Sequence, residues 1–203
     1  MALARWDRLG MVGGLILVLA TGSPGSAQPE PTPEEIGQIQ VYLTETEART
    51  RLFPDAAAFE RRVTALDSAT RSDLSDRLGR RVVDDSFAVY IARGDQGELL
   101  GYAAITEEVG KYRPITFMVG VKQNLSISDV AVLVYRESRG AQVRRQRFLR
   151  QYRGKSMDDP VRINRDIINI TGATMSVRAL NFGVRKTLAL TELVYRDSRA
   201  SLR

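Results

Sequence analysis

Two threonines in the stretch NITGATMSVRAL have the residue type and setting for chemistry at a hydroxyl group. Thr171 and Thr174 bracket Gly172 and Ala173, small residues that leave the backbone open to close approach by another group. A helical pattern follows, and the free N–H groups at a helix start favour a phosphate, with Ser176 as a further hydroxyl donor. Two interpretations follow: either threonine caps the helix, or Thr174 carries a phosphate-linked group.

The composition restricts how such a threonine would be modified. The chain has no His and no Cys, which excludes Ser-His-Asp triads, thiol nucleophiles, disulfides and zinc fingers. Because a threonine hydroxyl is a weak nucleophile without an adjacent base, we expect an external enzyme to activate it. The sequence contains no calcium-loop pattern, so we predict no metal site, and redox chemistry would require an organic cofactor.

The N-terminus has the pattern of a targeting segment. Arg5 and Arg8 precede an apolar run over residues 9–22, which is short for a membrane span of roughly 20 residues. Small residues follow, so we predict a signal peptide over residues 1–27, cleaved after Ala27, and a periplasmic location. An uncleaved inner-membrane anchor is the alternative.

The next segments have helical and linker character. Residues 28–52 are expected to form a Pro-rich linker and an N-terminal helix, which continues over residues 36–52. Residues 53–86 are expected to form a helical lead-in. Within it, Asp55 caps a short helix, and residues 61–78 form two further helical pieces.

The rest of the chain is expected to hold the main domain, over residues 87–193, followed by a C-terminal tail over residues 194–203. Apolar runs separated by turn signals predict strands at residues 87–92, 99–106, 115–121 and 127–135. After them we expect a basic helix within residues 140–154, an extended segment over 161–170 and a last helix over 175–193. The predicted fold class is α+β, a single domain with an antiparallel sheet of about four or more strands flanked by helices.

The order of these pieces resembles the FMN-binding domain family, as in the G subunit of the Rnf complex and the C subunit of the sodium-translocating NADH:quinone reductase. The fragments that carry the resemblance are LFP, GELLGYA, GKYRPITFMVGV, VLVYRESRG, FLRQYRGKS and ITGATMS. It covers roughly residues 87–190, with a looser fit back to Leu52. It implies FMN bound covalently through a phosphoester to Thr174, the second threonine of the motif, by an ApbE-type flavin transferase that uses FAD as the donor.

One position departs from the family pattern. The family often has an Asp three residues before the first Ser or Thr of the motif, where this chain has Ile168; the nearest acid is Asp166. If the transferase needs that carboxylate, modification is expected to be less efficient here.

Other residues are candidates for contact with the flavin. Glu137 and Gly140 match the family's Glu-[Ser/Thr]-x-Gly turn, where the carboxylate lies near the flavin, fixes the turn around Gly140 or is an exposed acid. Tyr112 either packs against the ring system or is an ordinary core or surface tyrosine. Lys155 and Ser156 either approach the phosphate or form a solvated loop.

Five arginines between Arg144 and Arg153 crowd the predicted basic helix, and three interpretations apply to them. They form a solvated face, a docking surface for an acidic redox partner, or a contact with anionic lipid. The formal charge of +6 is not by itself a nucleic-acid signature, and we predict no nucleic-acid partner.

Together these features predict an exported electron carrier, not an enzyme, that shuttles electrons between redox partner proteins, at the membrane or in the periplasm, with membership in a membrane electron-transport complex as one setting. The alternatives are a periplasmic FMN-dependent reductase for a small acceptor, and a flavin-free adaptor that docks through its Arg-rich helix.

Overall fold

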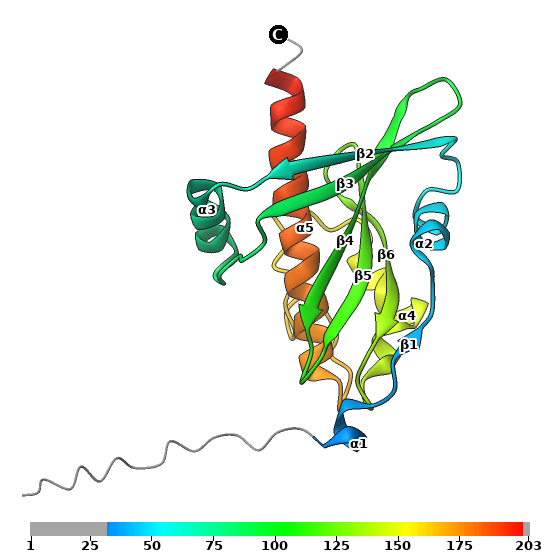
Figure 1. The fold of residues 1–203 in the computed structure, drawn as a ribbon, viewed down its shortest axis with the longest axis vertical. Helices are drawn as coiled ribbons and strands as arrows, with labels where there is room; N and C mark the ends of the chain where they lie inside the picture. Colours follow the sequence, from blue (N-terminus) through cyan, green and yellow to red (C-terminus); the bar gives the residue numbers. More distant parts are fainter. Residues whose placement is uncertain (1–31, 201–203) are drawn as a thin grey trace, which may run out of the picture. The chain divides into compact units, whose positions relative to one another are not determined.

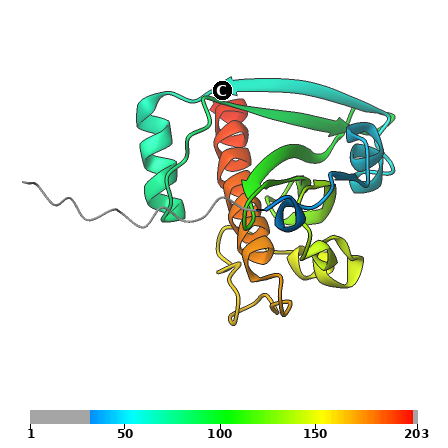
Figure 2. The same cartoon turned by 60° about the horizontal axis from the view of Figure 1, so that its bottom comes forward.

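A computed structural model describes residues 32–200, which form part of one compact unit that begins at Pro31. The core is a six-stranded antiparallel sheet with the strand order β1-β6-β5-β4-β3-β2, and helices cover both of its faces (Figures 1 and 2). The strands are β1 (Gln40–Val41), β2 (Ala58–Ala65), β3 (Ser86–Arg93), β4 (Leu99–Val109), β5 (Pro114–Lys122) and β6 (Ile127–Tyr135). The helices are α1 (Pro33–Ile36), α2 (Glu45–Leu52), α3 (Ser68–Leu78), η1 (Ala141–Arg144), α4 (Gln146–Leu149), η2 (Arg150–Tyr152) and α5 (Thr174–Ala200). The predicted α+β single-domain architecture is confirmed.

The long helix α5 packs across one face of the sheet, against β4 and β5. Its apolar residues Val177, Leu180, Val184, Leu188 and Leu190 are buried, as the sequence periodicity predicts. Gly183 allows the close approach, because a Cβ atom there would meet the ring of Phe117 and the side chains of Glu108 and Thr106. The sheet therefore fixes the position of α5, including its first turn.

The opposite face of the sheet is covered by α2. Thr44 and Glu47 form a capping box at the start of this helix, with 2.7 Å between the Thr44 nitrogen and Glu47 Oε2. Ala48 and Leu52 of the helix, and Phe53 after it, pack against small residues of the central strands. The strands β5 and β6 are thus buried on both faces, which explains why they appear in the sequence as nearly continuous apolar runs.

Two helix predictions in the N-terminal part are wrong, and a third is confirmed only in part. Residues 36–52 do not form one helix: α1 ends at Ile36, where Gly37 has a positive φ of 67°, and β1 separates α1 from α2. Asp55 lies in a turn and starts no helix. Of the two helical pieces predicted over residues 61–78, only α3 (Ser68–Leu78) forms. Residues 58–65 form the edge strand β2, which pairs with β3 along its whole length. Since this strand is exposed over most of its length, it lacks the apolar alternation by which a strand is recognised in a sequence.

Two further segments differ from expectation. The basic segment is not one helix but three short turns, η1, α4 and η2, because Arg145 is extended, with ψ of 135°, and interrupts the helical path. The last helix continues to Ala200, through most of the predicted tail.

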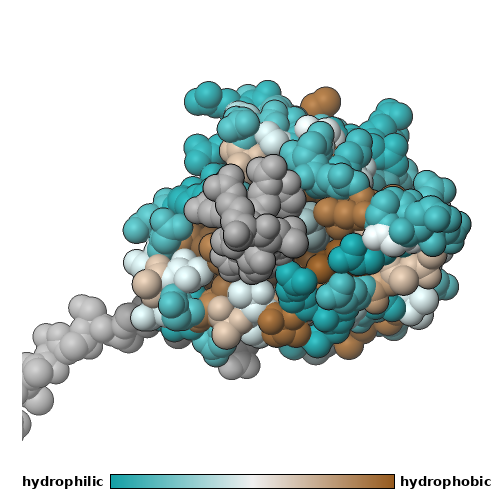
Figure 3. All heavy atoms as spheres, turned by 90° about the horizontal axis from the view of Figure 1, so that it is seen from above, coloured by the Kyte–Doolittle hydropathy of each residue, from teal (hydrophilic) through white to brown (hydrophobic). Residues whose placement is uncertain are grey.

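The face seen from above in Figure 3 is mainly hydrophilic, with hydrophobic residues scattered over it. Among the helices that the structure describes, none is long and apolar enough to cross a bilayer. The predicted signal peptide, residues 1–27, lies outside the described residues.

Candidate functional site

The candidate site is built on the first turn of α5. The first hydrogen bond within the helix joins the Val177 nitrogen to the Ala173 carbonyl oxygen at 2.9 Å, so Ala173 occupies the N-cap position. Ala173 has no side-chain oxygen, and the expectation that Thr171 or Thr174 caps the helix is therefore wrong. Thr171 and Gly172 are exposed in the turn before the helix, and Gly172 has a φ of 80°, a left-handed conformation that suits glycine. The N–H groups of the first turn thus receive no acceptor from a capping side chain.

The hydroxyl of Thr174, which is half-exposed, is oriented by Asn169. The Asn169 side-chain amide donates a hydrogen bond to Thr174 Oγ1 at 2.9 Å. The other polar atom of that amide, Asn169 Oδ1, is buried and has no hydrogen-bond partner among the described residues. A buried acceptor is seldom left unpaired, so this atom next to the Thr174 hydroxyl marks a candidate position for a further group or an ordered water. Sequence reasoning did not single out Asn169, although it lies five residues before Thr174.

A cavity of about 450 Å³ adjoins this asparagine. Its volume falls in the range of cofactor sites, roughly 300–1,000 Å³. The apolar side chains that line it are Phe148, Ile168 and Ile170, and the basic ones are Arg145, Arg147 and Arg150. An aromatic ring, two branched aliphatic side chains and several cations suit a planar, electron-accepting ring system with polar edges.

The start of α5 is fixed to the end of β6 through a buried contact. Tyr135 is fully buried, and its hydroxyl lies 2.8 Å from Ser176 Oγ and donates to the Arg139 carbonyl oxygen. Gly140 lies against both hydroxyls, because a Cβ atom there would come within 2.5 Å of Tyr135 Oη and 2.7 Å of Ser176 Oγ. Ser176 is only 2% exposed, so it anchors the helix from inside and does not present its hydroxyl beside Thr174.

This contact predicts an alkaline transition. Burial raises the pKa of Tyr135 to about 12, and the bond to Ser176 offsets only part of the shift. Because the folded-state pKa exceeds the ordinary value of 10.0, Tyr135 contributes stability in full below pH 10, and this is lost as the pH rises through about 12. Spectroscopic titration of tyrosinate is expected to show a step near pH 12 that the Tyr135→Phe variant lacks. A Tyr135 step near pH 10 in folded protein would contradict the burial.

Glu137 has a positioning role in the turn between β4 and β5. It is 6% exposed, and its Oε1 accepts hydrogen bonds from the backbone nitrogens of Tyr112 at 2.8 Å and Arg113 at 3.1 Å. The carboxylate therefore fixes this turn, not the one around Gly140, and it is not an exposed acid. Tyr112 is half-buried, with the Lys111 ammonium 4.4 Å from its ring centre. The β4–β5 turn, the end of β6 and the start of α5 all lie at one end of the sheet (Figure 1).

The loop between the basic segment and the motif is held by Asp166. Its carboxylate pairs with Lys155 at 2.9 Å and accepts from the backbone nitrogens of Val161 at 3.1 Å and Arg162 at 2.8 Å. These bonds outweigh burial and lower the pKa of Asp166. Lys155 thus contributes to the loop and not to a phosphate site. Since Asp166 is fully engaged, it cannot replace the acid absent at Ile168, which is 78% exposed.

The arginines of the basic segment separate into two groups. Arg144 stacks on Tyr42, 4.3 Å from its ring centre, and Arg153 forms an ion pair with Asp129 at 2.7 Å. For the other three, the cavity-lining Arg145, Arg147 and Arg150, no ion pair is found within residues 32–200. The cluster is therefore not a uniform solvated face, because three of its cations line the cavity beside Asn169.

Comparison with known proteins finds a family match over the part of the chain that holds these residues. Residues 110–189 match the model of the FMN-binding domain family, and all the candidate residues from Tyr112 to Ser176 lie inside that range. No curated protein matches the chain.

Among solved structures, the chain is similar to Shewanella oneidensis NqrC, with 16% identity and a TM-score of 0.48 over 82% of this chain and 81% of that one. It is also similar to the C subunit of the Na(+)-translocating NADH-quinone reductase from Parabacteroides distasonis, with 16% identity and a TM-score of 0.44 over 72% of this chain and 85% of that one. Over residues 110–189, the chain is thus similar to the FMN-binding domain family.

Proposed function

We propose that this protein is an exported electron carrier that holds FMN through a phosphoester on Thr174. The observation that carries the proposal is the hydrogen bond from Asn169 to Thr174 Oγ1, which links the acceptor hydroxyl to the cavity of about 450 Å³ that Asn169 lines. A group tethered at this oxygen would have a built cavity next to it.

The phosphate would bind at the start of α5. The N–H groups of the first turn are donors directed at this point, and the helix dipole adds about 0.3–1 kcal/mol for an anion at an exposed helix start. The amide of Asn169 lies 2.9 Å from Thr174 Oγ1, the atom that would become the ester oxygen. It would therefore stay next to the phosphoryl group. Gly172, which has no side chain, leaves the approach open.

The ring system would lie in the cavity, between Phe148, Ile168 and Ile170. When bound, FMN supplies one- and two-electron redox chemistry, and the protein contributes position, exclusion of water and electrostatics. Asn169 Oδ1, the buried acceptor without a partner, would face an N–H donor of the cofactor or an ordered water.

Attachment would require a separate enzyme. The Asn169 side chain, which is hydrogen-bonded to Thr174 Oγ1, is a neutral amide and not a base, and the chain has no His. A flavin transferase of the ApbE type would supply the activation. The exposed Thr171, Gly172 and Ile168 make the segment that leads into the motif accessible to such an enzyme.

We infer the setting of the carrier from the sequence. The signal-like residues 1–27 favour export to the periplasm, with an inner-membrane anchor as the alternative. Outside the cytoplasm, a covalent tether would prevent loss of the cofactor. The partners would be redox proteins, including those of a membrane electron-transport complex. Flavin-loaded protein is expected to turn over NADH with a soluble acceptor only when a partner is present. Rapid turnover by the isolated protein would instead assign it as a reductase.

The three cavity arginines would set the redox potential. A cation near the flavin favours the extra negative charge of the reduced state, by on the order of 1 kcal/mol per charge at partly screened distances. The Arg145→Gln/Arg147→Gln/Arg150→Gln variant is therefore expected to have a midpoint potential lower by some tens of millivolts in an anaerobic titration.

The control for this titration is the Arg51→Gln/Arg61→Gln/Arg62→Gln variant, which removes the same charge from α2 and β2. Equal shifts of the midpoint potential in the two variants would show that only net charge matters. Such a result would contradict the proposal that the ring system lies in this cavity.

A further inference from the structure

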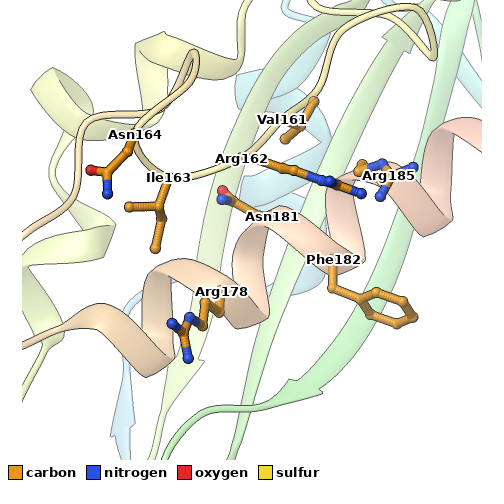
Figure 4. Close-up of a pocket in the computed structure, with 8 residues that line it drawn as sticks. All are labelled: Val161, Arg162, Ile163, Asn164, Arg178, Asn181, Phe182 and Arg185. Atoms are coloured by element: carbon orange, nitrogen blue, oxygen red, sulfur yellow. The ribbon is translucent and has the colours of Figure 1, made fainter. Parts of the chain in front are cut away.

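A second groove, of about 350 Å³, lies between α5 and the loop at residues 161–164 (Figure 4). Three arginines line it: Arg178 and Arg185, two turns apart on α5, and Arg162 from the loop. Figure 4 shows the side chains of Arg162 and Arg185 next to each other above the helix. None of the residues that line this groove lines the cavity beside Asn169, so the groove is a separate feature of the surface.

Among the described residues, the positive charge in this groove has no carboxylate partner; the Arg185 guanidinium donates a hydrogen bond to the Arg77 carbonyl oxygen at 3.4 Å. Nearby cations have carboxylate partners: Lys155 pairs with Asp166 at 2.9 Å, Lys186 with Glu108 at 2.7 Å, and Arg77 with Glu192 at 2.6 Å. Across residues 32–200, no carboxylate lies within ion-pair distance of the three groove arginines. Burial, together with the positive charge of Arg162, lowers the pKa of Arg185. Like charges held together in a half-buried groove favour the binding of an anion.

The backbone that presents Arg162 is held in a strained conformation. Val161 has a φ of 45° and Asn164 a φ of 63°, and a positive φ is a rare state for a β-branched residue such as Val161. The backbone nitrogens of Val161 and Arg162 donate hydrogen bonds to the Asp166 carboxylate, at 3.1 Å and 2.8 Å, and these bonds stabilise the conformation. The backbone position from which Arg162 extends its side chain along the groove is thus fixed by Asp166.

The floor of the groove is also ordered. Asn181, 7% exposed, lies on the groove side of α5, and its Oδ1 accepts a hydrogen bond from the Tyr152 hydroxyl at 2.7 Å. This bond orients the amide and leaves its nitrogen as the donor available to the groove. Phe182 adds an apolar wall at one side of the groove. The Arg80 guanidinium stacks on its ring, 4.2 Å from the ring centre. The groove therefore combines guanidinium groups, an amide donor and an aromatic surface.

We propose that this groove binds the phosphate or carboxylate group of a small anionic ligand, with Arg162 and Arg185 as the principal contacts and Arg178 and Asn181 as supporting ones. Guanidinium groups suit such oxyanions because their paired N–H donors match two oxygens of one group. A free metabolite and a lipid headgroup present the same chemistry, so the test must separate the two sources.

The test is a titration of the full-length purified protein with inorganic pyrophosphate, followed by the thermal unfolding midpoint and by calorimetry. A ligand that binds only the folded state raises the midpoint with concentration. We expect half-saturation below about 1 mM, the weak end of specific binding. The Arg162→Gln/Arg185→Gln variant is expected to raise the half-saturating concentration at least tenfold. The Arg51→Gln/Arg62→Gln variant, with the same loss of charge elsewhere, and Thr174→Ala are expected to bind as the wild type does.

Three outcomes would overturn the proposal. Equal pyrophosphate binding by the groove variant and the charge-matched control would show non-specific attraction, and loss of binding in Thr174→Ala would assign the groove to the flavin site. Sedimentation with phosphatidylglycerol vesicles, compared with phosphatidylcholine vesicles, identifies the source: recruitment that needs Arg162 and Arg185 supports the site with a lipid headgroup as its ligand. Binding of polyglutamate, with no response to pyrophosphate or vesicles, would refute a small ligand in favour of an acidic protein partner.

Discussion

Replacing Thr174 with alanine is expected to abolish covalent flavin attachment completely. Wild-type protein co-expressed with a flavin transferase should gain the mass of FMN less one water, and the Thr174→Ala variant should gain nothing. The reason is chemical, since the phosphoester needs the hydroxyl oxygen that Asn169 orients at 2.9 Å. Intact mass spectrometry of the mature protein under denaturing conditions measures this directly.

The fold is expected to survive the substitution. Thr174 is half-exposed in the first turn of α5, and its side-chain contact is a single hydrogen bond, worth about 1 kcal/mol. Alanine also has the higher helix propensity, which offsets part of that loss. Thermal unfolding of the variant should therefore match that of wild-type protein prepared without the transferase.

The matched control is Thr171→Ala, three residues earlier in the same motif. Thr171 is exposed, lies before the helix and does not cap it, so this variant should keep its flavin. Thr174→Ser, which retains a hydroxyl, should be flavinylated in part. Flavin that remains attached to Thr174→Ala after denaturation would place the attachment site on another residue.

The sequence predicts the central part of this fold well because those strands have strong local signals. The strand predicted over residues 127–135 coincides with β6, and α5 starts one residue before its predicted start. Both elements have the apolar periodicity of buried surface. The edge strand β2 and the short turns of the basic segment lack such a signal, since the first is mainly exposed and the second is shaped by tertiary packing.

In the candidate site, too, some features have a local sequence signal and others depend on tertiary packing. The motif alone predicts where Thr174 lies, at the start of a helix, but its partners depend on the tertiary structure. Tyr135 is 41 residues from Ser176 and Glu137 is 25 residues from Tyr112, so no local pattern reveals either contact. Asn169 was within reach of sequence reasoning, because a side-chain amide close in sequence to a candidate acceptor hydroxyl can hydrogen-bond to it. Its unpaired oxygen is visible only in the structure.

The Lys186→Met variant is expected to lose about 3–5 kcal/mol of unfolding free energy, the usual cost of leaving one member of a buried ion pair alone. Lys186 Nζ lies 2.7 Å from Glu108 Oε1, with the two side chains 7% and 5% exposed, where α5 crosses β4. It also lies 3.2 Å from Asp84 Oδ2, whose side chain is 39% exposed and therefore tolerates the loss of this partner better. The remaining cation near Glu108 is Arg80, at 3.8 Å and half-exposed, which is a weaker partner. Chemical denaturation of variant and wild type measures the difference.

The loss of unfolding free energy in Lys186→Met should depend on pH in a definite direction. This dependence distinguishes it from the effect of a packing defect. Burial raises the pKa of Glu108 above its ordinary value of 4.5, against the opposing effect of Lys186, so removing Lys186 raises this pKa further. A carboxyl group whose pKa is raised by folding adds stability below its unfolded pKa, and this is lost as the pH rises through the folded value. The variant should therefore approach wild-type stability near pH 4.5 and fall furthest behind it above neutral pH.

Two further variants distinguish charge from volume. Lys186→Met/Glu108→Leu also removes the carboxylate that the single variant leaves without its lysine, and a well-packed apolar pair is often as stable as the ion pair that it replaces, so most of the stability should return. Arg77→Met breaks the 2.6 Å pair with Glu192, whose two side chains are about one-third exposed, and should cost no more than about 1 kcal/mol. If the double variant were as unstable as Lys186→Met, and both were insensitive to pH, the loss would come from packing around Gly183, where α5 approaches the sheet most closely.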